Sequence, residues 1–197
     1  MTTRIAGILL AAGSGSRLGQ PKALVSFGGQ TLAERGVALL KDGGADPVIV
    51  VSGAAPVSVA GARTVYNPGW HTGMGSSLTA GLRALDADGA APRAAVIALA
   101  DQPLVGAGAV RRLIAAYADG ATVAVAAYDG KPRNPVLIAR EHWSAVLELA
   151  TGDAGARPFL RARPDLVTVV ECGDTGRPDD VDTAADLARI TRWAESS

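Results

Sequence analysis

The chain has 197 residues, with 19 basic and 19 acidic side chains, so its formal net charge is zero. A balanced charge argues against nucleic acids and anionic membrane surfaces as partners, because proteins of both classes depend on an excess of basic residues. The single cysteine, Cys172, cannot form an internal disulfide or a paired-cysteine metal site, and we expect it to be buried near the end of a strand. The length predicts one domain that spans residues 1–197.

The first apolar run, Ile5–Ala12, is too short to span a membrane. It leads directly into a glycine-rich turn rather than into a polar segment, which argues against a signal peptide and favours a cytoplasmic location. Within it, Ile5–Ala11 contains no polar residue, and this predicts a central strand that is covered on both faces.

Apolar runs and helical patterns alternate along the rest of the chain. The predicted strands are Asp46–Gly53, Arg63–Pro68, Ala94–Pro103, Ala121–Gly130, Asn134–Trp143 and Leu166–Cys172. The predicted helices are Thr31–Gly44, Ser76–Asp88, Gly108–Ala118, a segment that ends near Ala150, and Thr183–Ser196. This alternation is typical of βαβ units, so we predict a three-layer α/β/α fold with a mostly parallel sheet.

Three segments with chemically active side chains are expected at the carboxyl ends of strands. They are the glycine-rich turn that follows Ala11, the stretch around Met74, and Asp101. Ligands of open α/β sheets bind beyond the carboxyl ends of the strands. The sequence therefore predicts a binding site where these three segments meet.

The glycine-rich turn does not match the two best-known phosphate loops. The dinucleotide fingerprint G-x-G-x-x-G, started at Gly13, requires a third glycine at Leu18, but the glycine is Gly19. The acidic residue expected about 20 residues further on is also missing, because the second strand ends in Val-Val-Ser-Gly. The P-loop fails as well, since Gly19 is followed by Gln-Pro before Lys22. These mismatches disfavour a dinucleotide dehydrogenase and a P-loop NTPase.

The residues of the turn nevertheless suit a polyphosphate. Gly13 and Gly15 permit positive φ angles, so that successive N–H groups can face an anion. Arg17 offers a planar fork to phosphate oxygens, and Lys22 adds a point charge behind the stiff Pro21. The alternative is an ordinary glycine-rich connection with a solvated arginine and lysine.

Asp101 follows an apolar strand and precedes a turn closed by Pro103. A carboxylate in this position can hold Mg²⁺, which in proteins takes one or two carboxylates together with phosphate oxygens. The alternative is an aspartate that caps a helix or a turn.

Five ordered motifs together resemble the MobA-like NTP transferase family, and within it the molybdenum cofactor cytidylyltransferases (MocA type). They are L-A-A-G-x-G-x-R-L-G-x-P-K from Leu10, N-x-x-W-x-x-G-M-x-S-S-L-x-x-G-L from Asn67, D-Q-P at Asp101, G-D-x-G-A-R at Gly152–Arg157 and D-x-D-T-x-x-D-L from Asp180. The resemblance implies a Rossmann-like nucleotidyltransferase fold and Mg²⁺-dependent transfer of a nucleoside monophosphate, with release of pyrophosphate.

The resemblance also implies a role for individual residues. Arg17, Lys22 and Asp101 would be catalytic, Asp101 and Asp182 would hold the metal, with Asp180 as the alternative second ligand, and Arg157 would meet the acceptor. The nucleotide-binding residues would be Leu10, Ala11, Ala12, Gly13, Gly15, Ser16, Arg17, Lys22, Gly73, Met74, Ser76 and Ser77. The alternatives that the sequence leaves open are helix caps for Ser76 and Ser77, an N-cap for the Asp182-Thr183 pair, which could coexist with metal binding, and a solvated side chain for Arg157.

Ala11-Ala12-Gly13 resembles the loop of the cytidylyltransferases, which implies CTP as the donor. The implied acceptor is a molybdopterin-type cofactor whose dinucleotide form serves a client molybdoenzyme. The chain reads Arg133-Asn134-Pro135 where many members read Gly-His-Pro, and this departure leaves the acceptor open. The alternatives are a guanylyltransferase, a sugar- or alditol-phosphate nucleotidyltransferase, and a non-catalytic cofactor carrier. His71 and His142 are expected to be surface and structural residues, respectively.

Overall fold

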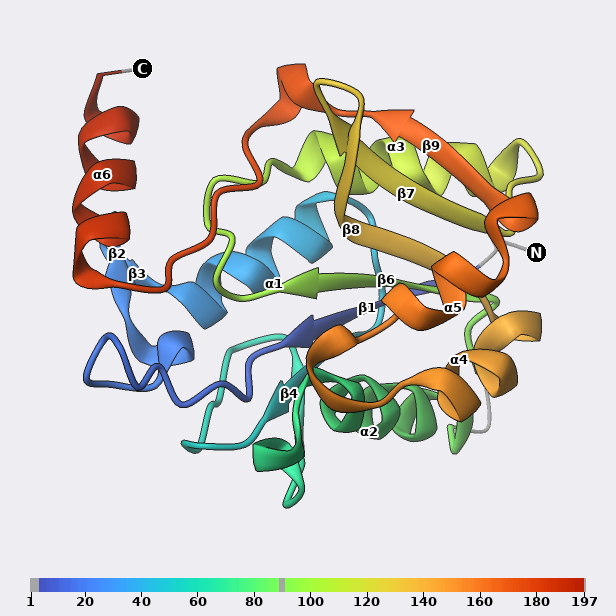
Figure 1. The fold of residues 1–197 in the computed structure, drawn as a ribbon, viewed down its shortest axis with the longest axis horizontal. Helices are drawn as coiled ribbons and strands as arrows, with labels where there is room; N and C mark the ends of the chain where they lie inside the picture. Colours follow the sequence, from blue (N-terminus) through green and yellow to red (C-terminus); the bar gives the residue numbers. More distant parts are fainter. Residues whose placement is uncertain (1–3, 89–90, 197) are drawn as a thin grey trace.

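The computed structural model describes residues 4–88 and 91–196 (Figure 1). Its main sheet has the strand order β5-β4-β1-β6-β8-β7-β9, and β8 runs antiparallel to both of its neighbours, β6 and β7. The strands are β1 (Ile5–Leu10), β4 (Val48–Ser52), β5 (Arg63–Tyr66), β6 (Ala94–Leu99), β7 (Val123–Tyr128), β8 (Lys131–Ala139) and β9 (Val167–Glu171). The order reverses at β1, so the edge beyond β1 and β6 is the expected position of a ligand.

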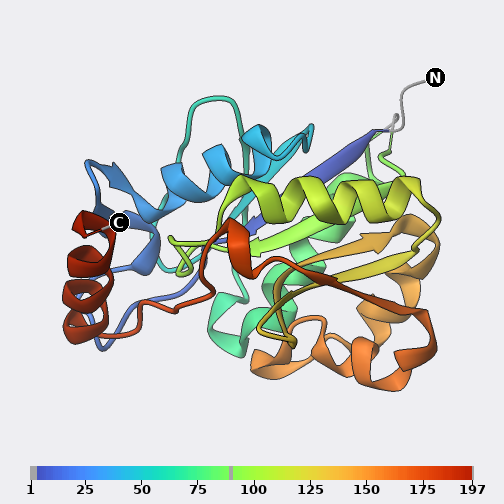
Figure 2. The same cartoon turned by 90° about the horizontal axis from the view of Figure 1, so that it is seen from above.

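Helices cover both faces of the sheet (Figure 2). The helices are α1 (Leu32–Asp42), α2 (Met74–Asp86), α3 (Ala107–Ala118), α4 (Trp143–Leu149), α5 (Arg157–Ala162) and α6 (Ala184–Glu195). One core lies between the sheet and α1 and α3, and the other lies between the sheet and α2, α4 and α5. The predicted three-layer α/β/α architecture is confirmed.

The sequence of β1 explains its central place. Ile5 and Leu9 point into the core with α1 and α3, whereas Ala6, Ile8 and Leu10 point into the opposite core. Alternation along a strand sends successive side chains to opposite faces, so a strand buried on both faces must be apolar throughout. All six residues of β1 are buried, as the uninterrupted apolar run predicts.

A third, smaller core lies beside the sheet. The short strands β2 (Ser26–Phe27) and β3 (Gln30–Thr31) form a hairpin, and α6 packs against it. The buried residues of this third core are Val25, Phe27, Leu32, Val181 and Ile190. Figure 1 shows α6 standing outside the sheet, next to this hairpin. None of the helices in the described residues is long and apolar enough to cross a membrane.

Several predicted boundaries are wrong. Helix α2 begins at Met74 rather than at Ser76, and its N-cap is Gly73, so neither Ser76 nor Ser77 is the cap. Strand β6 ends at Leu99, two residues before Asp101, where the sequence predicted its end. Strand β8 ends at Ala139 instead of Trp143, because a short 3-10 turn precedes α4. The Gly152–Arg157 motif, whose glycines are typical of a loop, holds a 3-10 turn (Gly152–Ala154) and the start of α5.

Candidate active site

The loop after β1 exposes backbone donors at the carboxyl edge of the sheet. In the part of the chain that the structure describes, no backbone carbonyl accepts a hydrogen bond from the N–H groups of residues 13–16. Gly15 has φ +59°, and a Cβ atom there would lie 2.0 Å from the carbonyl oxygen of Gln20, so the loop closes on itself only with glycine. A Cβ atom at Gly13 would meet nothing within 4 Å, which leaves the space beside it open. The loop can therefore present N–H groups to an anion.

Lys22 brings together the charged residues that the sequence predicted for the site. Its Nζ lies 2.7 Å from Oδ2 of Asp101 and 2.5 Å from Oδ1 of Asp182, and Arg17 Nη2 lies 3.3 Å from the same Asp182 oxygen. The side chains of Lys22 and Asp101 are only 20% and 22% exposed, whereas that of Arg17 is 67% exposed. Arg17, Lys22, Asp101 and Asp182 thus form one cluster, although they are up to 165 positions apart (182 minus 17).

The contacts within this cluster favour the charged forms of Lys22 and Asp182. Burial opposes the charged form of Lys22, but the charges and hydrogen bonds of Asp101 and Asp182 outweigh it and raise the pKa of Lys22. The hydrogen bond from Lys22 lowers the pKa of Asp182. Desolvation of the Asp180 carboxyl group, reinforced by the charges of Asp101 and Asp182, raises its pKa, although the residue as a whole is exposed.

The donor set of the cluster fits a magnesium ion only in part. Among the described residues, no group of three or more His, Cys, Asp and Glu side chains is arranged to hold a metal. Asp101 and Asp182 nevertheless converge on one cation, the Lys22 ammonium group. Two carboxylates suit Mg²⁺ when phosphate oxygens and water complete its six ligands, so the pair fits an ion that arrives with a nucleotide. Asp180 accepts a hydrogen bond from Gln102 instead.

The segment around Met74 is organised by Asn67, whose role the sequence did not reveal. This buried amide donates to Ser76 Oγ at 2.8 Å and to Ser77 Oγ at 3.1 Å, and its Oδ1 accepts from the Gly69 N–H. Ser76 Oγ also donates to the carbonyl oxygen of Gly69 or Gly73. Both hydroxyl groups therefore help to fix the start of α2. The position of Asn67 at the head of the N-x-x-W motif was the sequence feature that could have indicated its role.

The Gly152–Arg157 motif packs against the same helix start. A Cβ atom at Gly73 would lie 2.4 Å from the carbonyl carbon of Gly152, and one at Gly155 would lie 2.9 Å from Met74 Sδ. The two motifs therefore form one wall, about 80 residues apart in sequence (152 minus 73 is 79). Arg157 is exposed at the first position of α5, and within the described residues no hydrogen bond or ion pair joins it to the Lys22 cluster.

The remaining polar residues have structural positions. His71 is exposed and lies edge-on to Trp70, with 6.1 Å between the ring centroids. His142 shares a hydrogen bond of 2.9 Å with Thr122 Oγ1. Cys172 is fully buried directly after β9, as predicted.

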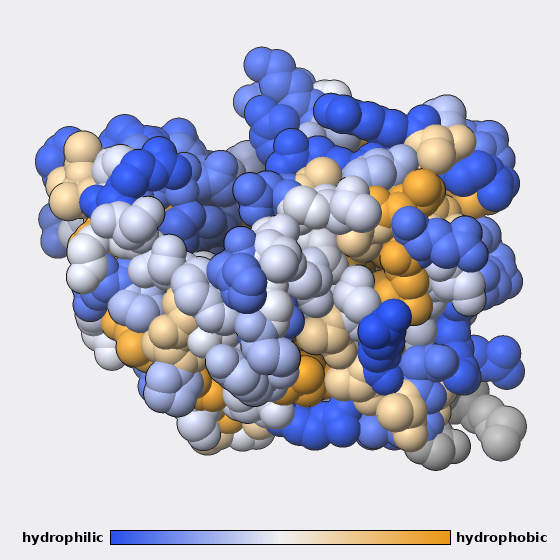
Figure 3. All heavy atoms as spheres, turned by 60° about the horizontal axis from the view of Figure 1, so that its bottom comes forward, coloured by the Kyte–Doolittle hydropathy of each residue, from blue (hydrophilic) through white to orange (hydrophobic). Residues whose placement is uncertain are grey.

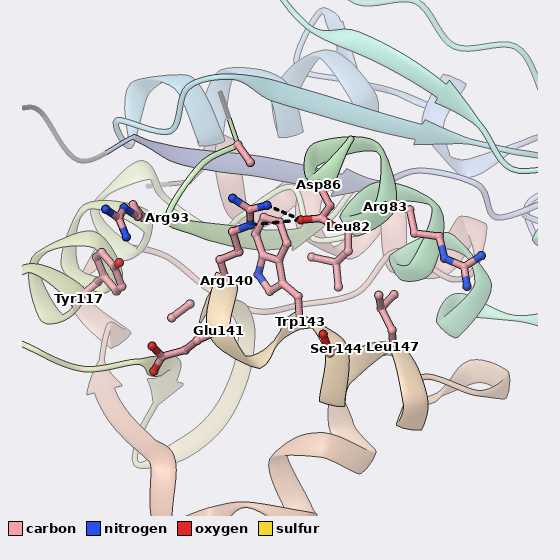
Figure 4. A pocket seen from close by; sticks show the side chains of 12 residues that line it. Leu82, Arg83, Asp86, Arg93, Tyr117, Arg140, Glu141, Trp143, Ser144 and Leu147 are labelled. Carbon is pink, nitrogen blue, oxygen red and sulfur yellow. Dashed lines mark hydrogen bonds and ion pairs between the residues drawn. The ribbon is translucent and has the colours of Figure 1, made fainter. Parts of the chain in front are cut away.

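A pocket of about 510 Å³ lies at the opposite end of the sheet, near the start of β6 and the end of β8 (Figure 4). Its charged lining residues are Arg83, Asp86, Arg93, Arg140 and Glu141. Arg140 forms an ion pair with Asp86, with 2.7 Å between Nη2 and Oδ1. Figure 4 marks this contact by dashed lines. This pocket is separate from the Lys22 cluster. Figure 3 shows the face at the bottom of Figure 1, where hydrophobic residues lie between hydrophilic ones.

Comparison with known proteins agrees with this geometry. The profile of the MobA-like NTP transferase domain matches residues 7–167, which is most of the chain. The chain belongs to the MobA-like NTP transferase family. Its sheet, switch point and loop after β1 are thus those of a nucleotidyltransferase fold. The matched region of this family domain ends before Asp182.

Relatives within and around the family carry different names. The chain is 38% identical over 200 aligned positions to nicotine blue oxidoreductase of Paenarthrobacter nicotinovorans, covering 94% of this chain and 96% of the relative. It is 38% identical over 109 positions to a molybdenum cofactor guanylyltransferase of Xanthomonas euvesicatoria pv. vesicatoria (strain 85-10), covering 55% of this chain and 53% of the relative.

Among solved structures, the Mycobacterium tuberculosis rv0371c homolog from Mycobacterium sp. strain JC1 superimposes with a TM-score of 0.83 at 30% identity. The superposition covers 100% of this chain and 99% of that chain. The agreement therefore includes the segment beyond residue 167 as well as the matched domain.

Proposed function

We propose that the chain transfers a nucleoside monophosphate from an NTP, with CTP as the preferred donor, to a phosphorylated acceptor of the molybdopterin type. One observation carries the proposal: the loop after β1 places Lys22 between Asp101 and Asp182, at the edge where residues 13–16 offer free N–H groups. Cations, amide donors and a carboxylate pair are together the requirements of phosphoryl-group chemistry.

In the proposed reaction, a phosphate oxygen of the acceptor attacks the α-phosphorus of the NTP in line, the bond to the β-phosphate oxygen breaks, and pyrophosphate leaves. The attacking phosphate is already an anion near neutral pH, so no strong general base is required. The N–H groups of residues 13–16 bind the triphosphate, and Arg17 and Lys22 neutralise charge that develops on its oxygens. Asp101 and Asp182 would hold Mg²⁺, which supplies further charge neutralisation at the phosphates.

The nucleobase would lie at the start of α2, near Gly73, Met74, Ser76 and Ser77. Supporting this, Asn67 fixes the hydroxyl groups of both serines. Ser77 is itself buried, so it would support the helix start from beneath, and Ser76 and Met74, which are partly exposed, would face the nucleobase. The acceptor would approach from the Gly152–Arg157 segment, which packs on the same helix start. We further propose that the protein works in the cytoplasm as a single domain and hands its product to a client molybdoenzyme.

The proposal is tested by measuring pyrophosphate release with Mg²⁺, each of the four NTPs, and either a molybdopterin-type cofactor or a sugar phosphate. We expect release with CTP and the cofactor, and a decrease of roughly 10²–10³ for Asp101→Ala. If GTP raises the melting temperature strongly and CTP does not, the proposed reaction would be guanylyl transfer instead of cytidylyl transfer. Equal release by the wild type and Asp101→Ala would support a non-catalytic carrier.

A redox reaction is the second candidate, because a relative that matches 94% of the chain is named an oxidoreductase. Reduced nicotinamide nucleotides also carry a diphosphate that the loop could hold, but the Asp101–Lys22–Asp182 arrangement favours transfer of a phosphoryl-type group. Oxidation of NADH or NADPH by an added aromatic dye, retained in Asp101→Ala, would favour the redox candidate. If the protein releases pyrophosphate and does not oxidise NADH or NADPH, the redox candidate is excluded.

A further inference from the structure

The segment that carries Asp182 crosses from β9 to α6, and we call residues 176–183 the C-terminal strap. It runs beside the loop that follows β6 and is joined to that loop by backbone hydrogen bonds. The Arg177 N–H donates to the Leu104 carbonyl at 2.9 Å, and the Val181 N–H donates to the Asp101 carbonyl at 2.8 Å. The strap is thus fastened to the residue whose carboxylate Asp182 must face.

The backbone of the strap and that of the loop after β6 approach each other closely at one end of this contact. A Cβ atom at Gly106 would lie 1.8 Å from the carbonyl oxygen of Thr175, and one at Gly176 would lie 2.3 Å from that of Leu104. Backbone therefore lies directly on backbone, and both positions require glycine. This end of the strap, close to α3, is held by the close packing of backbone against backbone.

The other end is held by a side chain. Gln102 is 5% exposed, and its Nε2 donates to Asp180 Oδ1 at 2.9 Å, with the Pro178 carbonyl at 3.4 Å. A buried amide without a partner is costly, so Gln102 favours the conformation in which the strap lies on it. Asp182 is two residues beyond Asp180, and its Oδ1 reaches Lys22.

We propose that Gln102 is a positioning residue, which holds Asp180 so that the strap keeps Asp182 beside Asp101. Asp180 then acts as an anchor for the strap rather than as a ligand of the metal. This inference rests on the proposed function for its consequence, since the paired carboxylates are those that would bind the metal. The hydrogen bond itself can be tested without any reaction.

Four variants separate the two roles of Asp180. Gln102→Leu and Asp180→Ala remove the hydrogen bond, whereas Asp180→Asn keeps an acceptor oxygen and removes only the charge. Asp165→Ala, at an exposed aspartate that pairs with Arg163, is the matched control. The first readout is amide hydrogen exchange at Val181 and Arg177 in metal-free protein. The second is the affinity for Mn²⁺ in the presence of CTP.

We expect Gln102→Leu and Asp180→Ala to exchange about tenfold faster or more at both amides, and to bind Mn²⁺ about tenfold more weakly, because they lose the hydrogen bond that holds the strap. Asp180→Asn and the control should match the wild type in both readouts. Loss of Mn²⁺ binding in Asp180→Asn with wild-type exchange would instead make Asp180 a ligand. Unchanged exchange in Gln102→Leu would overturn the proposal. If the wild type binds no Mn²⁺ with any NTP, the proposed function fails, and the exchange data still decide the role of Gln102.

Discussion

Lys22 is the residue on which the charges of the site depend, because its ammonium group lies between two carboxylates. In this position it stabilises Asp101 and Asp182 in the absence of a ligand. A metal ion held by the same oxygens would need the ammonium group to move toward the phosphates. We therefore predict that Lys22 would compete with a metal ion at these carboxylates when no nucleotide is present, and would act together with it once the phosphates of a nucleotide offer the ammonium group new partners.

Lys22→Met tests this competition. We expect the variant to bind Mn²⁺ more tightly than the wild type without nucleotide, because the competing cation is gone. We also expect its kcat to fall by roughly 10²–10³, because a charge that acts on the transition state is lost. Titration with Mn²⁺ and steady-state kinetics measure the two effects, and Lys41→Met, at an exposed lysine near the end of α1, is the control. Weaker binding of Mn²⁺ by Lys22→Met would contradict the competition.

The same variant predicts a change in pH dependence. The pKa of Asp182 is lower in the folded protein than in the unfolded chain, so this carboxylate stabilises the fold at pH values above its unfolded pKa of about 4. The stabilisation is lost as the pH falls through the lowered pKa. The raised pKa of Lys22 contributes stability that persists until the pH rises through the raised value, above ~10. The free energy of unfolding in urea should therefore be higher for the wild type than for Lys22→Met near neutral pH. The difference should shrink below pH ~4, and a difference that stays constant would argue against the pairing.

The loop between β1 and the 3-10 turn that starts at Lys22 uses its two first glycines differently. Gly15 closes the loop against Gln20, whereas Gly13 faces open space. One glycine is thus required by the fold and the other leaves room for a ligand. Both belong to the same G-x-G pattern, and from the sequence alone both were expected to permit a backbone whose N–H groups face an anion.

Gly15→Ala and Gly13→Ala separate these purposes. We expect Gly15→Ala to lower the free energy of unfolding by about 1–3 kcal/mol, because alanine is strained at positive φ and its Cβ would meet the Gln20 carbonyl. Gly13→Ala should keep the wild-type melting temperature and weaken CTP binding, since its methyl group enters the space beside the free N–H groups. Thermal unfolding and calorimetric titration with CTP measure both. If Gly13→Ala binds CTP as tightly as the wild type, the loop is not part of the CTP-binding site.

Other elements show how far the sequence could predict the structure. The apolar run of β1, the capping residue Thr183 and the position of Asp101 after β6 follow from local patterns, and the structure has them as expected. The Asp129-Gly130 pair between two apolar runs is typical of a hairpin turn, and it could have predicted the β7–β8 hairpin. Both residues have positive φ angles in the structure. The hydrogen bond from Gln102 to Asp180 joins residues 78 positions apart, so no local pattern could reveal it.

The whole molecule has two cores on the faces of the sheet and a third core that holds α6 against the β2–β3 hairpin. Val181, at the centre of the strap, belongs to this third core, next to Asp182. The packing of α6 therefore contributes to the geometry of the site from outside the sheet. The match to the family profile ends at residue 167, before Val181 and α6, so that match alone would not indicate this contribution.

Ile190→Ala tests whether the third core opens independently of the sheet. Ile190 is 1% exposed, and its truncation should cost about 2–5 kcal/mol, against about 0.5–1.5 kcal/mol for Ile190→Val. We expect native-state hydrogen exchange to accelerate in α6 and the strap, whereas amides of β1 and β6 stay protected. An equal loss of protection in all strands would show that the three cores unfold as one unit.

The strap has a consequence for the order in which the protein is assembled. Asp182 follows the last strand of the sheet, whereas Arg17 and Lys22 follow the first. During synthesis on the ribosome, most of the sheet and the loop after β1 can therefore form before Asp182 emerges. A nascent chain at this stage carries the cations of the site without their full complement of acidic partners, and its charge balance is completed only when the strap docks.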